Sequence, residues 1–161
     1  MIALIAVGTA LRLFVSGRPY RDLKLFSVKT HASPEETAMH IAHSRTRTGF
    51  LGLAIVLKAT GRVIGWAQAA AEAPHSVSIG LLLGREHWGD RIGTEAGTAF
   101  IDYLKARPGV ERIAALIDPA NVACLRGCEA LGFEREGVLK RAMPGFNGGP
   151  PHDGVMLAIV R

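Results

Sequence analysis

The chain has 161 residues, 48% of them hydrophobic, and a formal net charge of +5. This length and hydrophobic fraction suit a single compact domain over residues 1–161 and leave little room for a second full domain. The Lys and Arg residues are spread without a dense block, which argues against a nucleic-acid-binding protein and for a solvated basic face.

The first segment, Met1–Val15, is apolar enough to raise the question of a signal peptide or a membrane anchor. However, no positive charge directly follows its first residue, Arg12 interrupts it, and it is too short to span a bilayer. We therefore predict one or two buried strands, broken near Gly8, and no membrane partner.

A helix is predicted over Ser33–Ser44, because Ser33 is a good N-cap and is followed by a proline and by a glutamate three positions on. Phe50–Lys58 and Val63–Ala71 are rich in strand formers and are joined by a turn-like link, so they predict an antiparallel hairpin. The next strand, Val77–Leu83, is apolar on both faces and is therefore expected at the centre of the sheet.

Apolar residues recur at helical spacing over Ile92–Leu104, which predicts a helix that packs one face on the sheet. A strand over Arg112–Ile117 and a helix over Asn121–Leu131 follow.

The last predicted elements are a pair of strands, Phe133–Leu139 and Gly154–Val160. Their connection, Lys140–Asp153, is rich in Gly and Pro, so we expect a loop that forms one wall of a substrate pocket.

Two cysteines, Cys124 and Cys128, lie four positions apart on a predicted helix. This is a poor arrangement for a disulfide, and no other cysteine supports a zinc site. A reduced, cytoplasmic protein without a bound metal is the prediction.

The segment Trp88–Glu95 is a glycine-bearing turn between a predicted strand and a predicted helix. Glycines let backbone amides turn toward a ligand, and a helix start adds partial positive charge, an arrangement suited to a pyrophosphate. Taken alone, such a feature is more often only a turn. It matches neither the P-loop nor the dinucleotide-binding fingerprint, which argues against nucleotide hydrolysis and hydride transfer.

The segment Asp118–Arg126 joins a strand to a helix, with Asn121 as a natural N-cap. Cys124 has the chemistry to donate a proton to a leaving thiolate. The alternative is that Cys124 is a small buried hydrophobe, which is the commoner role of a free cysteine, and Cys128 is expected in the core.

A third motif, Leu131-Gly132-Phe133, is by itself a helix C-cap. In this order and spacing the three motifs resemble the GNAT superfamily of acyl-CoA-dependent N-acyltransferases, specifically its branch of ribosomal-protein N-terminal acetyltransferases. The resemblance covers about residues 50–160. Matching positions are Trp88, Gly89, Gly93, Thr94, Glu95, Ala96, Pro119, Asn121, Ala123, Arg126, Leu131, Gly132, Phe133, Glu136 and Gly137, with Cys124 at the family's serine and Asp153 at the acidic residue that opens the last strand.

The resemblance implies an α/β (α+β) fold with a mixed, mostly antiparallel sheet that is flanked by helices. It implies that the sheet is splayed between Val77–Leu83 and Arg112–Ile117, with the pantetheine arm of the co-substrate acetyl-CoA in the gap. The implied cofactor-binding residues are Arg91, Ile92, Gly93 and Thr94 for the pyrophosphate, Ile79 and Leu81 for the arm and thioester, and Asn121 and Arg126 for further contacts with CoA.

The implied reaction is direct attack of a neutral amine on the thioester, through an oxyanion stabilised by a backbone amide. Cys124 would then protonate the departing thiolate. Many relatives place a glutamate base on the central strand, where this chain has Ser78. We expect Cys124 and His75 to be catalytic. No carboxylate is an obvious base, and His75, Glu72, His152 and Asp153 are equal candidates for that role, each acting through water.

Two other features depart from the family pattern. Arg91 replaces the central glycine of the turn, and residues 1–30 lack the sequence with which members of the family usually begin. We predict an N-acetyltransferase acting on a protein N-terminus, an aminoglycoside or polyamine, or a small metabolite. The alternatives are transfer of a larger acyl group such as succinyl, and a non-catalytic CoA-binding regulatory module. A homodimer is compatible with so small and apolar a chain.

Overall fold

The computed structural model describes residues 1–6, 35, 39, 42–43, 46, 48–145 and 149–161. The described strands form a seven-stranded sheet in the order β1-β2-β3-β4-β5-β7-β6. Neighbouring strands are antiparallel except β4 and β5, which run parallel. This confirms the predicted mixed sheet with a central fourth strand. The strands are β1 (Ile2–Ala6), β2 (Phe50–Leu57), β3 (Val63–Ala73), β4 (Ser76–Leu83), β5 (Arg112–Ile117), β6 (Glu134–Met143) and β7 (His152–Val160).

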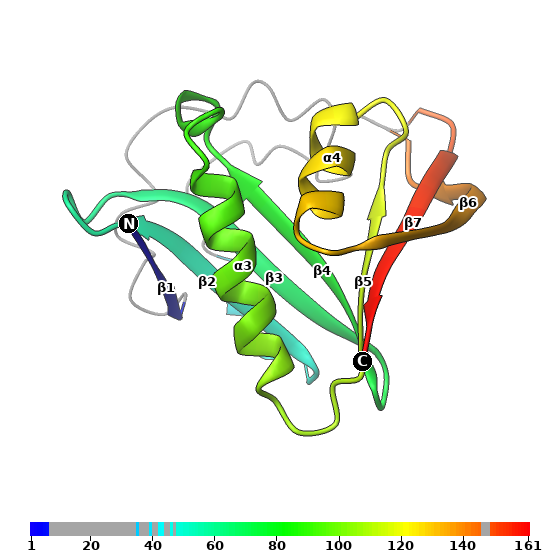
Figure 1. The fold of residues 1–161 in the computed structure, drawn as a ribbon, viewed down its shortest axis with the longest axis horizontal. Coiled ribbons are helices and arrows are strands. Elements are labelled where there is room, and N and C mark those ends of the chain that lie inside the picture. Colours follow the sequence, from blue (N-terminus) through cyan, green and yellow to red (C-terminus); the bar gives the residue numbers. More distant parts are fainter. Residues whose placement is uncertain (7–34, 36–38, 40–41, 44–45, 47, 146–148) are drawn as a thin grey trace.

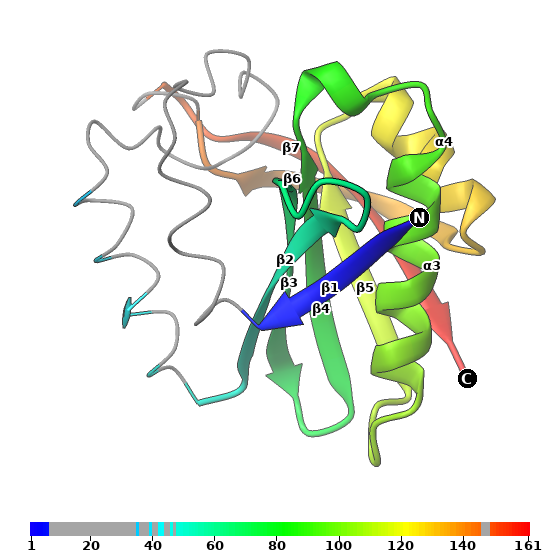
Figure 2. The same cartoon turned by 90° about the vertical axis from the view of Figure 1, so that its left-hand side faces the viewer.

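Two helices, α3 (Ile92–Lys105) and α4 (Val122–Ala130), cover the same face of the sheet, as Figures 1 and 2 show. Helix α3 repeats apolar residues every four positions, at Ala96, Phe100 and Leu104, and all three are buried. Burying a side chain such as Phe100 contributes about 1.5–3 kcal/mol, so this stripe holds the helix on the sheet. In the described segments, every helix is too short or too polar to cross a membrane.

The sheet is splayed at its centre. Strands β4 and β5 pair only at their starts, and the last pair is Ser78 with Ala114. Beyond it, β4 continues to Leu83 and β5 to Ile117 without pairing to each other. Figure 1 shows the two strands diverging from the end nearest the C-terminus. Among the described residues, the backbone groups on this edge of β4 beyond Ser78 therefore have no partner strand, as the family resemblance implied.

The end of the chain departs from prediction. The expected loop Lys140–Asp153 is partly strand, because β6 runs on to Met143 and β7 begins at His152. A register shift between Leu139 and Met143, with Arg141 at a positive φ of 51°, lets the ladder continue past the expected end. The predicted second N-terminal strand lies outside the described residues, as does most of the predicted helix Ser33–Ser44.

Candidate active site

The glycine-bearing turn ends at the first turn of α3. Arg91 is the N-cap and has left-handed backbone angles (φ 59°, ψ 4°), and its carbonyl accepts the first helical hydrogen bond, from the Glu95 N–H, at 2.9 Å. In the part of the chain that the structure describes, no group accepts from the amides of Ile92, Gly93 and Thr94. Such unpaired amides at a helix start attract anions.

Gly93 adds a second observation. A Cβ built at this position would meet no protein atom within 4 Å. Packing within the described fold therefore does not require a glycine at this point. A ligand lying against the helix start would require one, because a side chain would occupy its place. Phosphate groups are typical ligands of such an open helix start.

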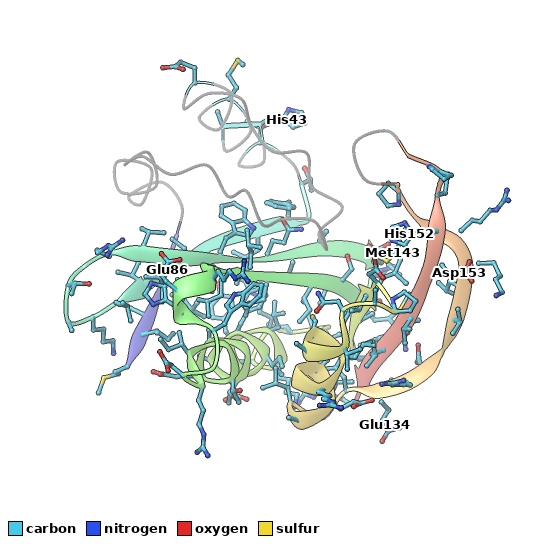
Figure 3. The ribbon with its side chains drawn as sticks, turned by 90° about the horizontal axis from the view of Figure 1, so that it is seen from above. His43, Glu86, Glu134, Met143, His152 and Asp153 are labelled. Carbon is cyan, nitrogen blue, oxygen red and sulfur yellow. The ribbon has the colours of Figure 1, made fainter. Side chains whose placement is uncertain are left out.

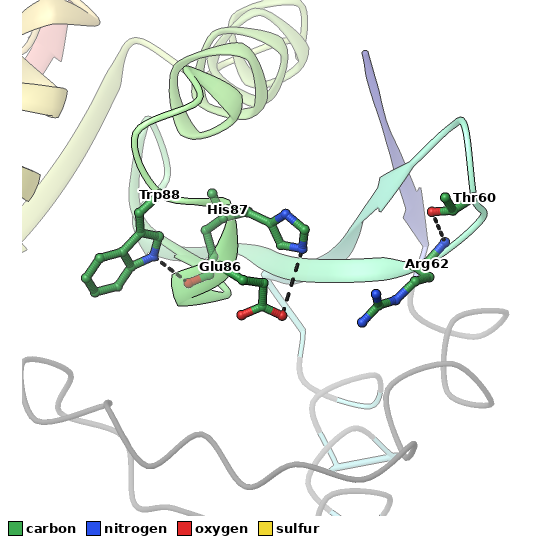
Figure 4. Close-up of polar contacts among 6 residues, drawn as sticks. Thr60, Arg62, Glu86, His87 and Trp88 are labelled. Carbon is green, nitrogen blue, oxygen red and sulfur yellow. Dashed lines mark hydrogen bonds and ion pairs between the residues drawn. The ribbon is translucent and has the colours of Figure 1, made fainter.

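Trp88 fixes the turn to the end of β4. Its indole Nε1–H donates to the Leu83 carbonyl at 2.9 Å, as Figure 4 shows, while about half of the side chain stays exposed. The motif residue Glu95 also has a structural role, because its Oε1 accepts from the Ile2 N–H at 2.8 Å and so joins β1 to the start of α3. Trp88 thus holds the turn at the end of β4, beside the splay, and Glu95 holds the helix start against the edge strand β1.

The strand residues predicted to hold the pantetheine arm lie at the splay. Ile79 and Leu81 follow the last β4–β5 pair, and both side chains pack into the core. Ser78, at that last pair, donates its hydroxyl to Glu72 Oε1 on β3 at 2.6 Å. A carboxylate from the neighbouring strand therefore lies near the position where relatives place a glutamate.

The turn after β5 is a chain of short hydrogen bonds. Asp118 Oδ1 accepts from the Ala120 N–H at 2.7 Å, and the Asp118 carbonyl accepts from the Asn121 N–H at 2.8 Å. Asn121 Oδ1 in turn accepts from the Cys124 N–H at 3.1 Å, the N-cap bond predicted from the sequence. This chain fixes Cys124 in the first turn of α4, close to the open end of the splay.

Cys124 and Cys128 interact through their thiols. A hydrogen bond from the Cys128 thiol lowers the pKa of Cys124, against the opposing effect of burial, and the same bond raises the pKa of Cys128. Both thiols are free and partly buried against the core. Arg126 is exposed on the same helix, where its charge is accessible to an anionic ligand.

The structure does not bring His75 together with Cys124. His75 is exposed in the turn before β4, and its carbonyl accepts from the Arg112 N–H at 3.1 Å, at the start of β5. Cys124 follows the other end of that strand. Five residue steps of strand separate the two ends by about 17 Å.

His152, one of the alternative bases, lies at the same end of β5 as Cys124. Its Nε2 is 3.1 Å from Asp118 Oδ2, and the two side chains are 30% and 13% exposed. Figure 3 shows His152 beside Met143, its register partner on β6. The motif analysis included Asp118 but gave it no role, because nothing local indicates a contact between residues 34 positions apart.

A family model described as an acetyltransferase (GNAT) domain matches residues 15–134. A Bacillus licheniformis protein named uncharacterized N-acetyltransferase p20 is 33% identical over 88 residues, which are 53% of this chain and 49% of that protein. The aligned region thus spans about half the length of this curated relative.

Two solved structures share the fold. A ribosomal-protein-S5-alanine acetyltransferase from Vibrio fischeri superposes with a TM-score of 0.78 at 21% identity, covering 99% of this chain and 91% of that one. A spermidine N-acetyltransferase from Vibrio cholerae, in complex with CoA and spermine, gives 0.82 at 16% identity, covering 99% and 95%.

Proposed function

The chain belongs to the acetyltransferase (GNAT) family, and on this premise we propose that it transfers an acetyl group from acetyl-CoA to a primary amine. The observation that carries the proposal is the row of unpaired amides at the start of α3, next to the splay between β4 and β5. The helix start attracts the pyrophosphate, and the open strand edge offers hydrogen bonds to the amide groups of the pantetheine arm.

Each residue has a defined part in this proposal. The amides of Arg91–Thr94 hold the pyrophosphate, and Arg126 adds a positive charge on α4. Backbone groups at Ile79 and Leu81 position the arm, and a backbone amide there stabilises the oxyanion. Asn121 orients the first turn of α4 through its cap.

Cys124 completes the proposal as the proton donor. The nitrogen–carbon bond forms first and gives the oxyanion. When the oxyanion collapses, the carbon–sulfur bond breaks, and the sulfur departs as a thiolate that needs a proton. A thiol with a lowered pKa gives up its proton more readily, so the bond from Cys128 favours this transfer. We assign His75 no role in this proposal, because it lies at the other end of β5 from Cys124.

The acceptor class follows from what the structural neighbours are named for. They act on a ribosomal-protein alanine and on spermidine, both of which present primary amines. We infer an amine acceptor, either a protein N-terminus or a polyamine-like small molecule. In this proposal residues 1–161 form a single domain that binds it. A cytoplasmic site of action is part of the same proposal, supported by the two free cysteines.

Calorimetry with acetyl-CoA tests the cofactor site. We expect wild-type protein to bind and a Gly93→Leu variant to lose binding while remaining folded, because the added side chain meets open space in the protein and leucine is a better helix former than glycine. Arg126→Glu should also weaken binding. The matched control for the charge reversal is Arg107→Glu. Arg107 lies just beyond the other end of α3, about 20 Å from Gly93. Equal binding by Gly93→Leu and wild type would refute the pyrophosphate assignment.

A further inference from the structure

Building on the transferase activity proposed above, we propose that His152 is the base that deprotonates the acceptor amine and that Asp118 is its positioning residue. The pair joins the start of β7 to the end of β5 at a separation of 3.1 Å. A base must lie close to the acid that acts on the other side of the same reacting group. Asp118 links the two groups, because its side chain pairs with His152 and its carbonyl accepts from Asn121, the N-cap of the helix that carries Cys124.

The connection to Cys124 runs through Asp118. One of its carboxylate oxygens pairs with His152, while the other accepts from the Ala120 N–H. The Asp118 carbonyl accepts from Asn121, whose side chain caps the turn that carries Cys124. A few short contacts therefore fix the imidazole and the thiol relative to one another, as a base and an acid acting on one thioester require.

The surroundings of His152 favour proton transfer. A Cβ at Gly154 would lie 2.6 Å from Leu116 and 2.9 Å from Met143, so the missing side chain lets these two apolar groups approach β7 two residues from His152. An ammonium that enters this partly apolar site loses hydration, which favours its neutral form. The Asp118 carboxylate lies 3.1 Å from Nε2 and orients the imidazole.

Asp153, the neighbouring carboxylate, is already engaged. The Arg141 backbone N–H donates to Oδ1 at 3.0 Å and Lys140 pairs with Oδ2 at 2.9 Å, and together they hold the pKa of Asp153 below its ordinary value. A carboxylate held in its charged form is a weak proton acceptor. In the part of the chain that the structure describes, the charged group seen to pair with His152 is Asp118, whereas Asp153, the next residue of the strand, points to the opposite face.

Glu72 fits the role less well than His152. It is exposed and accepts from Ser78, at the last point where β4 and β5 are still paired. The splay that would receive the arm opens beyond this point. Histidine is also the side chain that ordinarily takes up and releases protons between pH 5 and 8.

The protons balance in this scheme. The acceptor enters as an ammonium and leaves as an amide, so it gives up two protons. The first passes to His152 and on to solvent. The second is released as the amide forms and restores the proton that Cys124 gives to the thiolate.

The test measures thiol release from acetyl-CoA, with spermidine and an alanine-initiated peptide as acceptors, over a range of pH. His152→Gln should lower kcat at neutral pH by about 10²-fold or more while acetyl-CoA binding is unchanged. Its rate should keep rising with pH, because the amine then loses its proton without help. Asp118→Asn keeps the acceptor oxygen for Ala120 but loses the charge beside His152, and we expect a smaller loss in kcat with the KM for acetyl-CoA unchanged.

The outcomes distinguish a failure of the base role of His152 from a failure of the transferase activity itself. A His152→Gln variant with wild-type kcat and pH profile would overturn the base assignment, as would loss of the acidic limb in His75→Gln or Glu72→Gln instead. Absence of turnover with both acceptors in a wild-type protein that binds acetyl-CoA would overturn the transferase activity and the base role together. The variant Arg107→Gln, beyond the far end of α3, serves as the control for substitution alone.

Discussion

Arg91 offers a test of the turn's backbone and of its charge at once. It takes a left-handed conformation at the N-cap of α3, where relatives of the resembled branch have glycine. For a residue with a Cβ this conformation costs roughly 1–2 kcal/mol. Replacement by glycine removes that cost. However, glycine gives the unfolded chain more conformational entropy, which lowers the free energy of unfolding by about 0.5–1 kcal/mol. The midpoints of these two ranges give an expected net gain of about 0.75 kcal/mol for Arg91→Gly.

A chain of this length gains about 2–4 °C in Tm for each kcal/mol. Thermal unfolding should therefore place Arg91→Gly a few degrees above wild type, while Arg91→Ala, which keeps its Cβ, should show no such gain. The guanidinium is expected to pair with a phosphate, and a charge-assisted hydrogen bond contributes about 1.5–3 kcal/mol. Both variants should therefore bind acetyl-CoA about tenfold weaker or worse. If Arg91→Gly is no more stable than Arg91→Ala, the strain argument fails.

Three further predictions concern the site and its frame. Cys124→Ala should lower kcat by about 10²-fold with acetyl-CoA affinity retained, and a loss of only a few-fold in steady-state assays would remove its role as acid. Trp88→Phe loses the hydrogen bond to Leu83 and should cost about 0.5–1.5 kcal/mol in denaturant unfolding, so unchanged stability would show that the ring alone holds the turn. Arg112 forms a bidentate pair with Glu136, and its hydrogen bonds hold the pKa of the Glu136 carboxyl below its ordinary value. The stability difference between wild type and Glu136→Gln should therefore be full at neutral pH. It should vanish as the pH falls below the usual glutamate pKa of about 4.3. A difference that persists in acid would contradict this.

The fold was predictable where local signals were strong. The strand Arg112–Ile117 matches its predicted bounds, and Asn121 caps α4 as expected, because burial pattern and capping chemistry are local. The end of β6 was mispredicted. Its continuation to Met143 depends on pairing with β7 across a register shift, and that pairing lies outside the reach of a local pattern.

The site divides in the same way. The turn that ends at Arg91 carries its own signal, since glycines before a helix predict exposed amides. The ion pair of His152 with Asp118 and the bond of Ser78 to Glu72 are tertiary contacts, and no spacing in the sequence predicts them. His75 stays a sequence-based prediction, and its location far from Cys124 gives it no support.

The central claim, acetyl transfer to a primary amine, is tested most directly by mass spectrometry of spermidine and of an alanine-initiated peptide incubated with acetyl-CoA and the wild-type protein. The account predicts an acceptor heavier by one acetyl group, with one thiol released per acetyl group transferred, and far slower transfer by Cys124→Ala. Tight binding of acetyl-CoA with no acetylated product from either acceptor would contradict it.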